Sequence, residues 1–97
     1  MEGKIWFMAE PFRMLVANIY SLPDGPAVTG VIEAGSVRVG DSLTLIGSSG
    51  EMPVKVIFIQ AFQKVFEVAE AKDGIVGLTL SGVDHDQIRN RDLLVRK

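Results

Sequence analysis

Residues 28–41 of the chain read Val28-Thr29-Gly30-Val31-Ile32-Glu33-Ala34-Gly35-Ser36-Val37-Arg38-Val39-Gly40-Asp41. Runs of β-branched residues, which favour strands, lie between the glycines of this stretch. Gly35 and the pair Gly40-Asp41 predict chain reversals, because glycine readily adopts the positive φ that a tight turn needs. Gly30 instead interrupts a strand, which predicts a bulge or a bend too tight for a Cβ. The stretch therefore predicts two strands, with glycines that shape the backbone and do not form a phosphate loop.

The rest of the chain shows the same succession of short strand signals and turn residues. Residues 21–26 have strong turn chemistry, with two prolines and a glycine. Further strands are predicted at residues 12–20, 27–33, 43–46, 54–62, 75–80 and 93–95. Residues 65–71 suit a helix or a strand with turns, and the short strands around them favour the strand; residues 84–88 predict a short helical turn. Short strands without a long helix predict an all-β fold, a barrel or a sandwich.

Length and composition limit the classes of protein that the chain can be. Its 97 residues support one hydrophobic core, and 47% hydrophobic residues exclude a disordered chain. The net charge of −2 lacks the basic surplus with which nucleic-acid binders neutralise phosphates. There is no cysteine, which excludes disulfides and thiolate metal sites, and His85 is the single histidine. We expect one domain over residues 1–97 that holds no metal and no cofactor.

The N-terminal residues predict neither a membrane anchor nor a signal peptide. The apolar residues 5–8 form too short a run for either, and Glu2 and Glu10 flank them. A cytoplasmic protein is therefore expected. Residues 1–11 either add an N-terminal strand or trail from the domain. Trp6 and Phe7 are better interpreted as residues that cap a small core than as a stacking platform for bases.

The quoted stretch and its neighbours together resemble a known domain. Residues 28–41 resemble the pattern V-T-G-R-V-E-x-G-x-I-K-V-G-D-E in the second domain of elongation factor Tu and related translational GTPases. Residues 17–25 resemble that family's opening strand and turn D-V-F-S-I-P-G; residues 43–47, 59–64 and 76–83 resemble V-E-I-V-G, V-E-M-F-R-K and V-G-L-L-L-R-G-I, and residues 84–95 follow the closing segment. The resemblance covers residues 12–95 in order. It implies a small closed antiparallel β-barrel of about six strands, as a free-standing domain.

The resemblance also implies an RNA-contacting surface, but this chain differs from the family at most of its contact positions. The family barrel helps to hold the aminoacylated 3′ end of transfer RNA. The acidic residue that lies against the terminal adenine is Gln60 here, the arginine of the same motif is Gln63, and only Lys64 is kept. The family's asparagine before V-G-L-L-L is Ile75, and the arginine of its R-G pair is Ser81. The lost charges remove phosphate contacts, so RNA is a weakened candidate partner.

Nucleotide binding is not expected of this chain. In the family, GTP binds to a separate N-terminal domain through the motif G-x-x-x-x-G-K-[ST], whose amides and lysine hold the phosphates. Gly3-Lys4-Ile5 lacks the hydroxyl residue and the upstream glycine of that motif, and no Asn-Lys-x-Asp motif occurs. The barrel is expected to begin too close to residue 1 to leave room for such a domain. We expect a protein that is neither a GTPase nor another enzyme.

One cluster, Asp84-His85-Asp86, has the composition of a general-base site. A histidine between two carboxylates can accept a proton. A solvated loop is the better interpretation, because the family has a variable charged loop at this place. The three residues are also too few and too close in sequence to enclose a metal ion, and no serine lies in a G-x-S-x-G elbow.

The longest apolar runs lack the alternation that a barrel strand needs, since alternate residues of such a strand face solvent. Residues 12–20 are apolar on both sides, and so are residues 54–62. In the second run one side reads Val54, Val56, Phe58, Gln60 and Phe62, and the other reads Lys55, Ile57, Ile59 and Ala61. Such a surface predicts a partner or a second copy that covers it.

We therefore expect a binding module that docks to a protein partner or to itself as a homo-oligomer. The candidate contact residues for a partner or RNA are Gln60, Phe62, Gln63, Lys64, Lys55, Ile57 and Ile59. The alternative is an RNA- or ribosome-associated accessory of translation. That function would use the lysines of this set together with the basic tail, Arg89, Arg91, Arg96 and Lys97.

Overall fold

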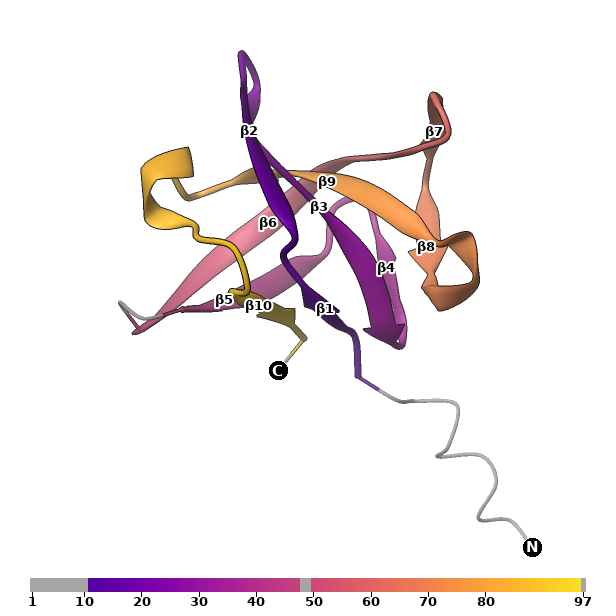
Figure 1. Cartoon of the computed structure of the whole chain (residues 1–97), viewed down its shortest axis with the longest axis horizontal. Helices are drawn as coiled ribbons and strands as arrows, with labels where there is room; N and C mark the ends of the chain where they lie inside the picture. Colours follow the sequence, from indigo (N-terminus) through magenta and orange to yellow (C-terminus); the bar gives the residue numbers. More distant parts are fainter. Residues whose placement is uncertain (1–10, 48–49, 97) are drawn as a thin grey trace, which may run out of the picture.

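The computed structural model describes residues 11–47 and 50–96, and these form a closed antiparallel barrel (Figure 1). The strands pair around the barrel in the order β1-β10-β5-β6-β9-β3, and pairing of β1 with β3 closes the ring. The predicted all-β barrel of six strands is confirmed. Residues 1–10, with the candidate N-terminal strand, Trp6 and Phe7, lie outside the described residues. The ring consists of β1 (Arg13–Leu15), β3 (Gly25–Ala34), β5 (Ser42–Gly47), β6 (Gly50–Ala61), β9 (Ile75–Ser81) and β10 (Leu93–Val95).

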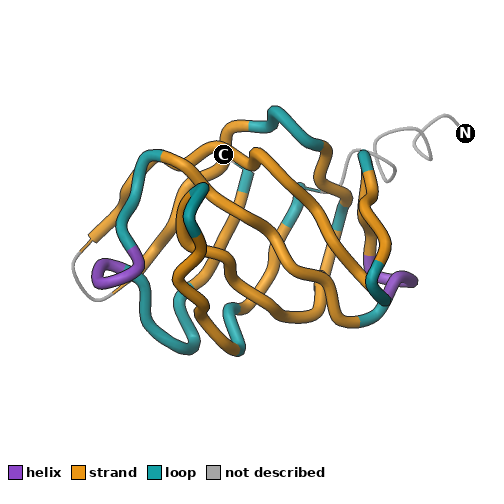
Figure 2. The backbone as a smooth tube through the Cα atoms, turned by 90° about the horizontal axis from the view of Figure 1, so that it is seen from above, coloured by secondary structure: helices purple, strands orange, loops and turns teal. Residues whose placement is uncertain are grey.

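Within residues 11–47 and 50–96, four further strands and two helical turns extend the barrel. Two of these strands are added to strands of the ring: β2 (Asn18–Leu22) pairs with β3, and β7 (Lys64–Phe66) pairs with β6. The other two, β4 (Ser36–Arg38) and β8 (Val68–Glu70), pair with each other. The 3-10 turns η2 (Ala71–Asp73) and η3 (His85–Gln87) lie at opposite ends of the molecule (Figure 2). The strand with turns and the short helical turn expected from the sequence are both present.

Side chains from every strand of the ring fill the barrel. Moving one such large side chain out of water stabilises the fold by about 1.5–3 kcal/mol. Alternate residues of the strands face the other way, toward the outside. No helix in the described residues has the length and hydropathy of a membrane span. The largest fully buried side chains include Phe12, Met14, Ile32, Leu45, Ile59, Leu78, Leu80 and Leu94.

A bulge in β6 explains the run that is apolar on both sides. The register of β6 against β9 shifts between Val56 and Phe58, so Ile57 has no partner residue on β9. The extra residue inverts the alternation, because the side chains after it point to the opposite side from the one that a regular strand would give. The grouping into two sides that regular alternation predicts along residues 54–62 is therefore wrong, although the outward side still carries Phe58 and Phe62. The inward side chains are Val54, Val56, Ile59 and Ala61, and the outward ones are Lys55, Phe58, Gln60 and Phe62.

Residues 12–20 form two strands instead of the single strand expected. The chain changes its hydrogen-bonding partner between them: the Val16 N–H donates to the carbonyl of Asp92 at 2.8 Å, and the Ala17 N–H donates to the carbonyl of Thr29 at 2.7 Å. The segment before the change alternates as a barrel strand should, with Met14 fully buried and its neighbours exposed. The second apolar surface expected along this run is accordingly absent from β1.

Gly30 of β3 lies against the end of β1. A Cβ at this position would lie 2.3 Å from the carbonyl oxygen of Leu15 and 3.1 Å from Cε of Met14. The first distance is far below van der Waals contact and involves backbone, so a side chain would push β1 away from β3. Gly30 therefore has no room for a Cβ, as predicted, whereas its pairing with Val76 of β9 is regular and shows no bulge.

We expect Gly30→Ala to lower the free energy of unfolding by about 3 kcal/mol, because its Cβ would overlap the β1 backbone. Gly77→Ala is the matched control, since a Cβ there has its nearest neighbour, Cγ2 of Thr29, at an ordinary 3.6 Å. The control should leave stability unchanged or raise it by up to about 1 kcal/mol. Urea titrations followed by circular dichroism measure both values, and equal effects of the two substitutions would contradict the role given to Gly30.

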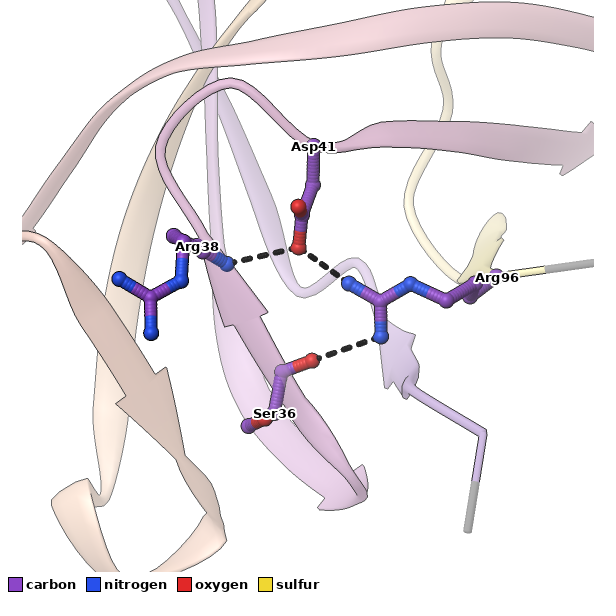
Figure 3. A network of polar contacts seen from close by, with 4 residues as sticks. All are labelled: Ser36, Arg38, Asp41 and Arg96. Atoms are coloured by element: carbon purple, nitrogen blue, oxygen red, sulfur yellow. Dashed lines mark hydrogen bonds and ion pairs between the residues drawn. The ribbon is translucent and has the colours of Figure 1, made fainter. Parts of the chain in front are cut away.

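A polar latch ties the last strand to the turn after β4 (Figure 3). The Asp41 carboxylate accepts a hydrogen bond from the Arg38 N–H at 2.9 Å, which closes the turn, and it also pairs with the Arg96 guanidinium. Arg96 donates a further hydrogen bond to the carbonyl of Ser36 at 3.0 Å. Gly40, which precedes Asp41, has a φ of 96°, and Gly35 has a φ of 70°. Both glycines therefore have the positive φ expected from the sequence.

Arg96→Ala should lower the free energy of unfolding by about 1 kcal/mol, because it removes an ion pair and a charge-assisted hydrogen bond that are partly shielded from solvent. Arg13→Ala is the control: its ion pair with Glu33, at 2.8 Å, joins side chains that are 55% and 45% exposed. We expect it to cost at most about 0.5 kcal/mol. The difference should shrink in high salt, and a larger loss for Arg13→Ala would refute the latch.

Candidate interaction surface

The outer side of five neighbouring strands forms one continuous face. Cross-strand pairing places Asn18, Thr29, Gly77, Gln60 and Val65 side by side, on β2, β3, β9, β6 and β7 in that order. On the three barrel strands among these, the flanking side chains point into the core, so this row points outward. We call these five residues the central row.

A second row lies beside the central row and forms a depression. Tyr20, Ala27, Thr79 and Phe58 are successive cross-strand partners. Ala27 and Thr79 are only 9% and 5% exposed although they are on the outer side, because they are small and their neighbours cover them. Tyr20 and Phe58, at the two ends, remain about half exposed. We call these four residues the low row.

A third row, on the other side of the central row, stands above the surface. Val31 and Ile75 are cross-strand partners, and Phe62 follows Gln60 by two residues, with its ring 4.0 Å from the position of a Cβ at Gly74. Val31, Ile75 and Phe62 are 48%, 66% and 75% exposed. Bulky apolar side chains with this exposure form a ridge, and we call them the high row.

A pocket lies at the end of the low row. The β2–β3 hairpin projects beyond the barrel (Figure 1), and its tip and β6 enclose a volume of about 440 Å³. Pockets that hold small organic groups have volumes in this range. The lining is largely apolar, with Gln60 and Thr79 as neutral polar groups and Asp24 at the hairpin tip. The lining residues are Leu22, Pro23, Asp24, Ile57, Phe58, Gln60 and Thr79.

The three rows together contain no side chain that is charged at neutral pH, and we call them the neutral face. Charges occur only around it. Asp24 and Lys55 lie at the end with the pocket, and Glu33 beyond Val31 is held by Arg13. Three neighbouring apolar side chains on this face, Phe62, Ile75 and Val65, are each more than 60% exposed. Clustered apolar exposure on a folded domain marks a contact surface.

The turn that carries Phe62 is strained. Phe62 and Gln63 form the two-residue connection between Ala61 of β6 and Lys64 of β7, and their φ values are 53° and 63°. Positive φ at both central residues is typical of a type I′ turn, in which asparagine and glycine are strongly preferred. A left-handed conformation costs about 1–2 kcal/mol for a residue with a large side chain. Holding an exposed phenylalanine in this turn therefore lowers the stability of the folded chain.

The structure brings together some of the predicted contact residues and separates others. Gln60 and Phe62 lie on the neutral face, Gln63 lies beside it in the turn, and Ile57 and Lys55 lie at the pocket end. Ile59 is 0% exposed, so its side chain is part of the core and is not available to a partner. Lys64 pairs with Ala61, whose side chain points inward, and it therefore projects away from the neutral face.

The other charged candidates lie away from this face or are already engaged. Arg96 is held by Asp41, and Arg89 and Arg91 are exposed in the segment before β10. Lys97 lies outside the described residues. His85 Nε2 lies 3.1 Å from an oxygen of Asp86, and both side chains are more than half exposed. Among the described residues, no three acidic or histidine side chains are placed to hold a metal ion.

Several residues of the neutral face have no distinctive signal in the sequence. Tyr20, Thr29, Val31, Val65 and Thr79 come from four separate strands, and each looks like an ordinary strand residue in its own segment. The outward position of Thr29 and Val31 could be inferred from the alternation after Gly30. The juxtaposition with Val65 needs the register of β6 and β7, which the sequence does not show.

The closed ring of six antiparallel strands fits the barrel fold of the second domain of elongation factor Tu and related translational GTPases. Translation elongation factor SelB from Methanococcus maripaludis, in its apo form, is similar to this chain at 34% identity and a TM-score of 0.80. The match covers 90% of this chain but only 19% of SelB, so the chain spans about a fifth of that factor's length. No model of a protein family matches the chain. The chain is thus similar to a barrel domain of a translation factor.

The double substitution Phe62→Asn with Gln63→Gly should raise the free energy of unfolding by about 1 kcal/mol, since both residues suit the type I′ turn. Gln63→Ala keeps the strain at both positions and should leave stability within about 0.5 kcal/mol of the wild type. Chemical denaturation of the three proteins measures the difference. A loss of stability in the double variant would show that the turn is not strained.

Proposed function

We propose that this chain is a non-catalytic binding module of the cytoplasmic translation apparatus, which docks to a protein through its neutral face. The observation that carries the proposal is the combination of an uncharged outer face across five strands with an exposed Phe62 held on a strained turn. Chains with this barrel are parts of larger factors, as the 19% coverage of SelB illustrates. We expect such a module to contact other parts of an assembly through its surface.

The charge distribution supports a protein partner over a nucleic acid. Binding to RNA relies on cations that displace counterions from phosphates. The neutral face has none, Lys64 projects from the opposite side of its hairpin, and Arg96 is engaged in the latch. Protein contact surfaces, in contrast, have a core depleted of charge and enriched in aromatic residues. Tyr20, Phe58 and Phe62 meet that description.

The same features support a role without catalysis. The single histidine of the chain lies beside Asp86 on an exposed turn, and it does not line the pocket. The pocket is lined by one carboxylate at its rim and otherwise by neutral groups, so it has no general acid paired with a base. The proposal therefore includes the absence of GTPase activity from this chain.

We expect Val65→Glu to abolish capture of translation proteins by the tagged chain, because the variant places a charge in the neutral face. Val65 is 63% exposed, so the fold should tolerate the change. Val39→Glu is the matched control: Val39 is 39% exposed and follows β4, outside the face. Quantitative affinity purification should show ribosomal or factor proteins with wild type and control only. If the same proteins are captured by Val65→Glu, or if none belongs to translation, the proposal is refuted.

A second candidate function follows from the pocket. Gln60 occupies the position whose acidic counterpart lies against the terminal adenine in the family, and it lines a pocket of about 440 Å³. An amide can hydrogen-bond to a base edge, so the pocket suits the 3′ nucleoside of an RNA.

Filter binding at low salt with an RNA that ends in a 3′ adenosine tests this second function. Binding should require the intact 3′ end, weaken steeply with salt, and fall at least tenfold in Gln60→Ala but not in Gln63→Ala. Equal binding of RNA with an oxidised 3′ end would count against it.

A further inference from the structure

The neutral face carries both a projection and a cavity of matching chemistry. Phe62 projects from one side of the central row, and the pocket opens on the other side, beside Phe58. From these features we propose that the neutral face is the contact between two copies of this chain, related by a two-fold axis, with Phe62 of each copy seated in the pocket of the other. This inference rests on the proposed docking function and names its partner.

The spacing along β6 suits a two-fold arrangement. Gln60 lies between Phe58, which is two residues or about 6.6 Å away along the strand, and Phe62, which is the first residue of the turn after β6. A two-fold axis that lies in the interface along the central row reverses the direction of β6 in the second copy. Phe62 of one copy then lies over Phe58 and the pocket of the other, and the reverse contact forms at the same time, as an isologous interface requires.

The other strands show the same complementarity. On β9, Gly77 of the central row lies midway between Ile75 of the high row and Thr79 of the low row. The same axis therefore places Ile75, which is 66% exposed, over Thr79, which is 5% exposed. On β3 it places Val31, which is 48% exposed, over Ala27, which is 9% exposed. The ridge of each copy meets the depression of the other.

The absence of charge is the condition that favours a second copy over another protein. In a face that packs against itself, a residue on the two-fold axis meets its own image, so a charge there would face a like charge at a cost in free energy. The neutral face has no charged residue. On the axis, Gln60 faces Gln60, and an amide carries both donors and an acceptor, so it can pair with itself.

The pocket suits a phenyl ring in size and in lining. Its volume of about 440 Å³ exceeds that of a phenylalanine side chain, and Leu22, Pro23, Ile57 and Phe58 give it apolar walls. The strained turn that holds Phe62 out of the barrel is then explained by the contact that Phe62 makes. Aromatic side chains that fill a partner's pocket typically carry most of the energy of an interface.

Sedimentation velocity of the full chain, from low micromolar to millimolar concentration, tests the proposal. We expect a monomer–dimer equilibrium. The variant with Phe62→Asn and Gln63→Gly, which keeps the fold, should raise the dimer dissociation constant at least tenfold. Leu22→Trp, which fills the pocket from an exposed strand position, should do the same. Val39→Thr, outside the face, should leave the constant unchanged.

Mixing the two face variants gives the sharper result. The variant without the Phe62 side chain keeps an open pocket, whereas the Leu22→Trp variant has a filled pocket and keeps Phe62. Only the mixed pair can form one complete contact without a clash, so heterodimers should form more tightly than either variant self-associates. Native mass spectrometry with one isotopically labelled variant measures this.

Three outcomes would overturn the two-fold contact: a strict monomer for the wild type, a dimer that both face variants leave intact, or no heterodimer in the mixture. None of them depends on the docking of translation proteins. If the wild type is a monomer whereas Val65→Glu still loses those proteins, the proposed function stands and the second copy is ruled out. If the dimer forms and no translation protein is captured, the contact between two copies stands and the proposed role in translation is ruled out.

Discussion

The pairing of β1 with β3, beside which Gly30 lies against the carbonyl of Leu15, is the contact on which the rest of this structure depends. The six strands form a closed ring only if the first strand reaches the third, and the carbonyl of Leu15 occupies the space that a Cβ of residue 30 would need. One edge of β3 therefore serves two partners, β1 along its last residues and β2 along its first, while the other edge pairs with β9. Without the close approach, the strands would form an open sheet with exposed edges.

Closure also determines where the surface features lie. Because β3 is longer than its contact with β1, its first part extends past the ring with β2 as a projecting hairpin. β6 extends past its contact with β5 in the same way and turns into β7. These two extensions border the outer side of β9, which lies between them. The depression and the ridge of the neutral face are consequences of where the hairpins leave the barrel.

Local signals were sufficient to predict the barrel, whereas the face needed the register of distant strands. The glycines of residues 28–41 and the turn residues between strands mark where the chain reverses, and their order identifies the closed barrel. The bulge at Ile57 leaves no trace, because Val56, Ile57 and Phe58 are all apolar and any of them would suit the core. The turn at Phe62 was equally hidden, since neither residue is one that a type I′ turn favours.

The hydrophobic fraction of 47% has two separate sources in this fold. Most of it fills the barrel, which any closed barrel requires. The remainder, with Phe62, Val65 and Ile75 at its centre, lies outside on a surface that carries no charge. Exposed apolar residues scattered over a surface are common and need no explanation. Here they are adjacent, they lie beside a pocket of the same character, and one of them occupies a strained backbone conformation. Backbone strain lowers the stability of a fold and is concentrated at functional sites, so the strain at Phe62 favours a function for the contact that its side chain makes.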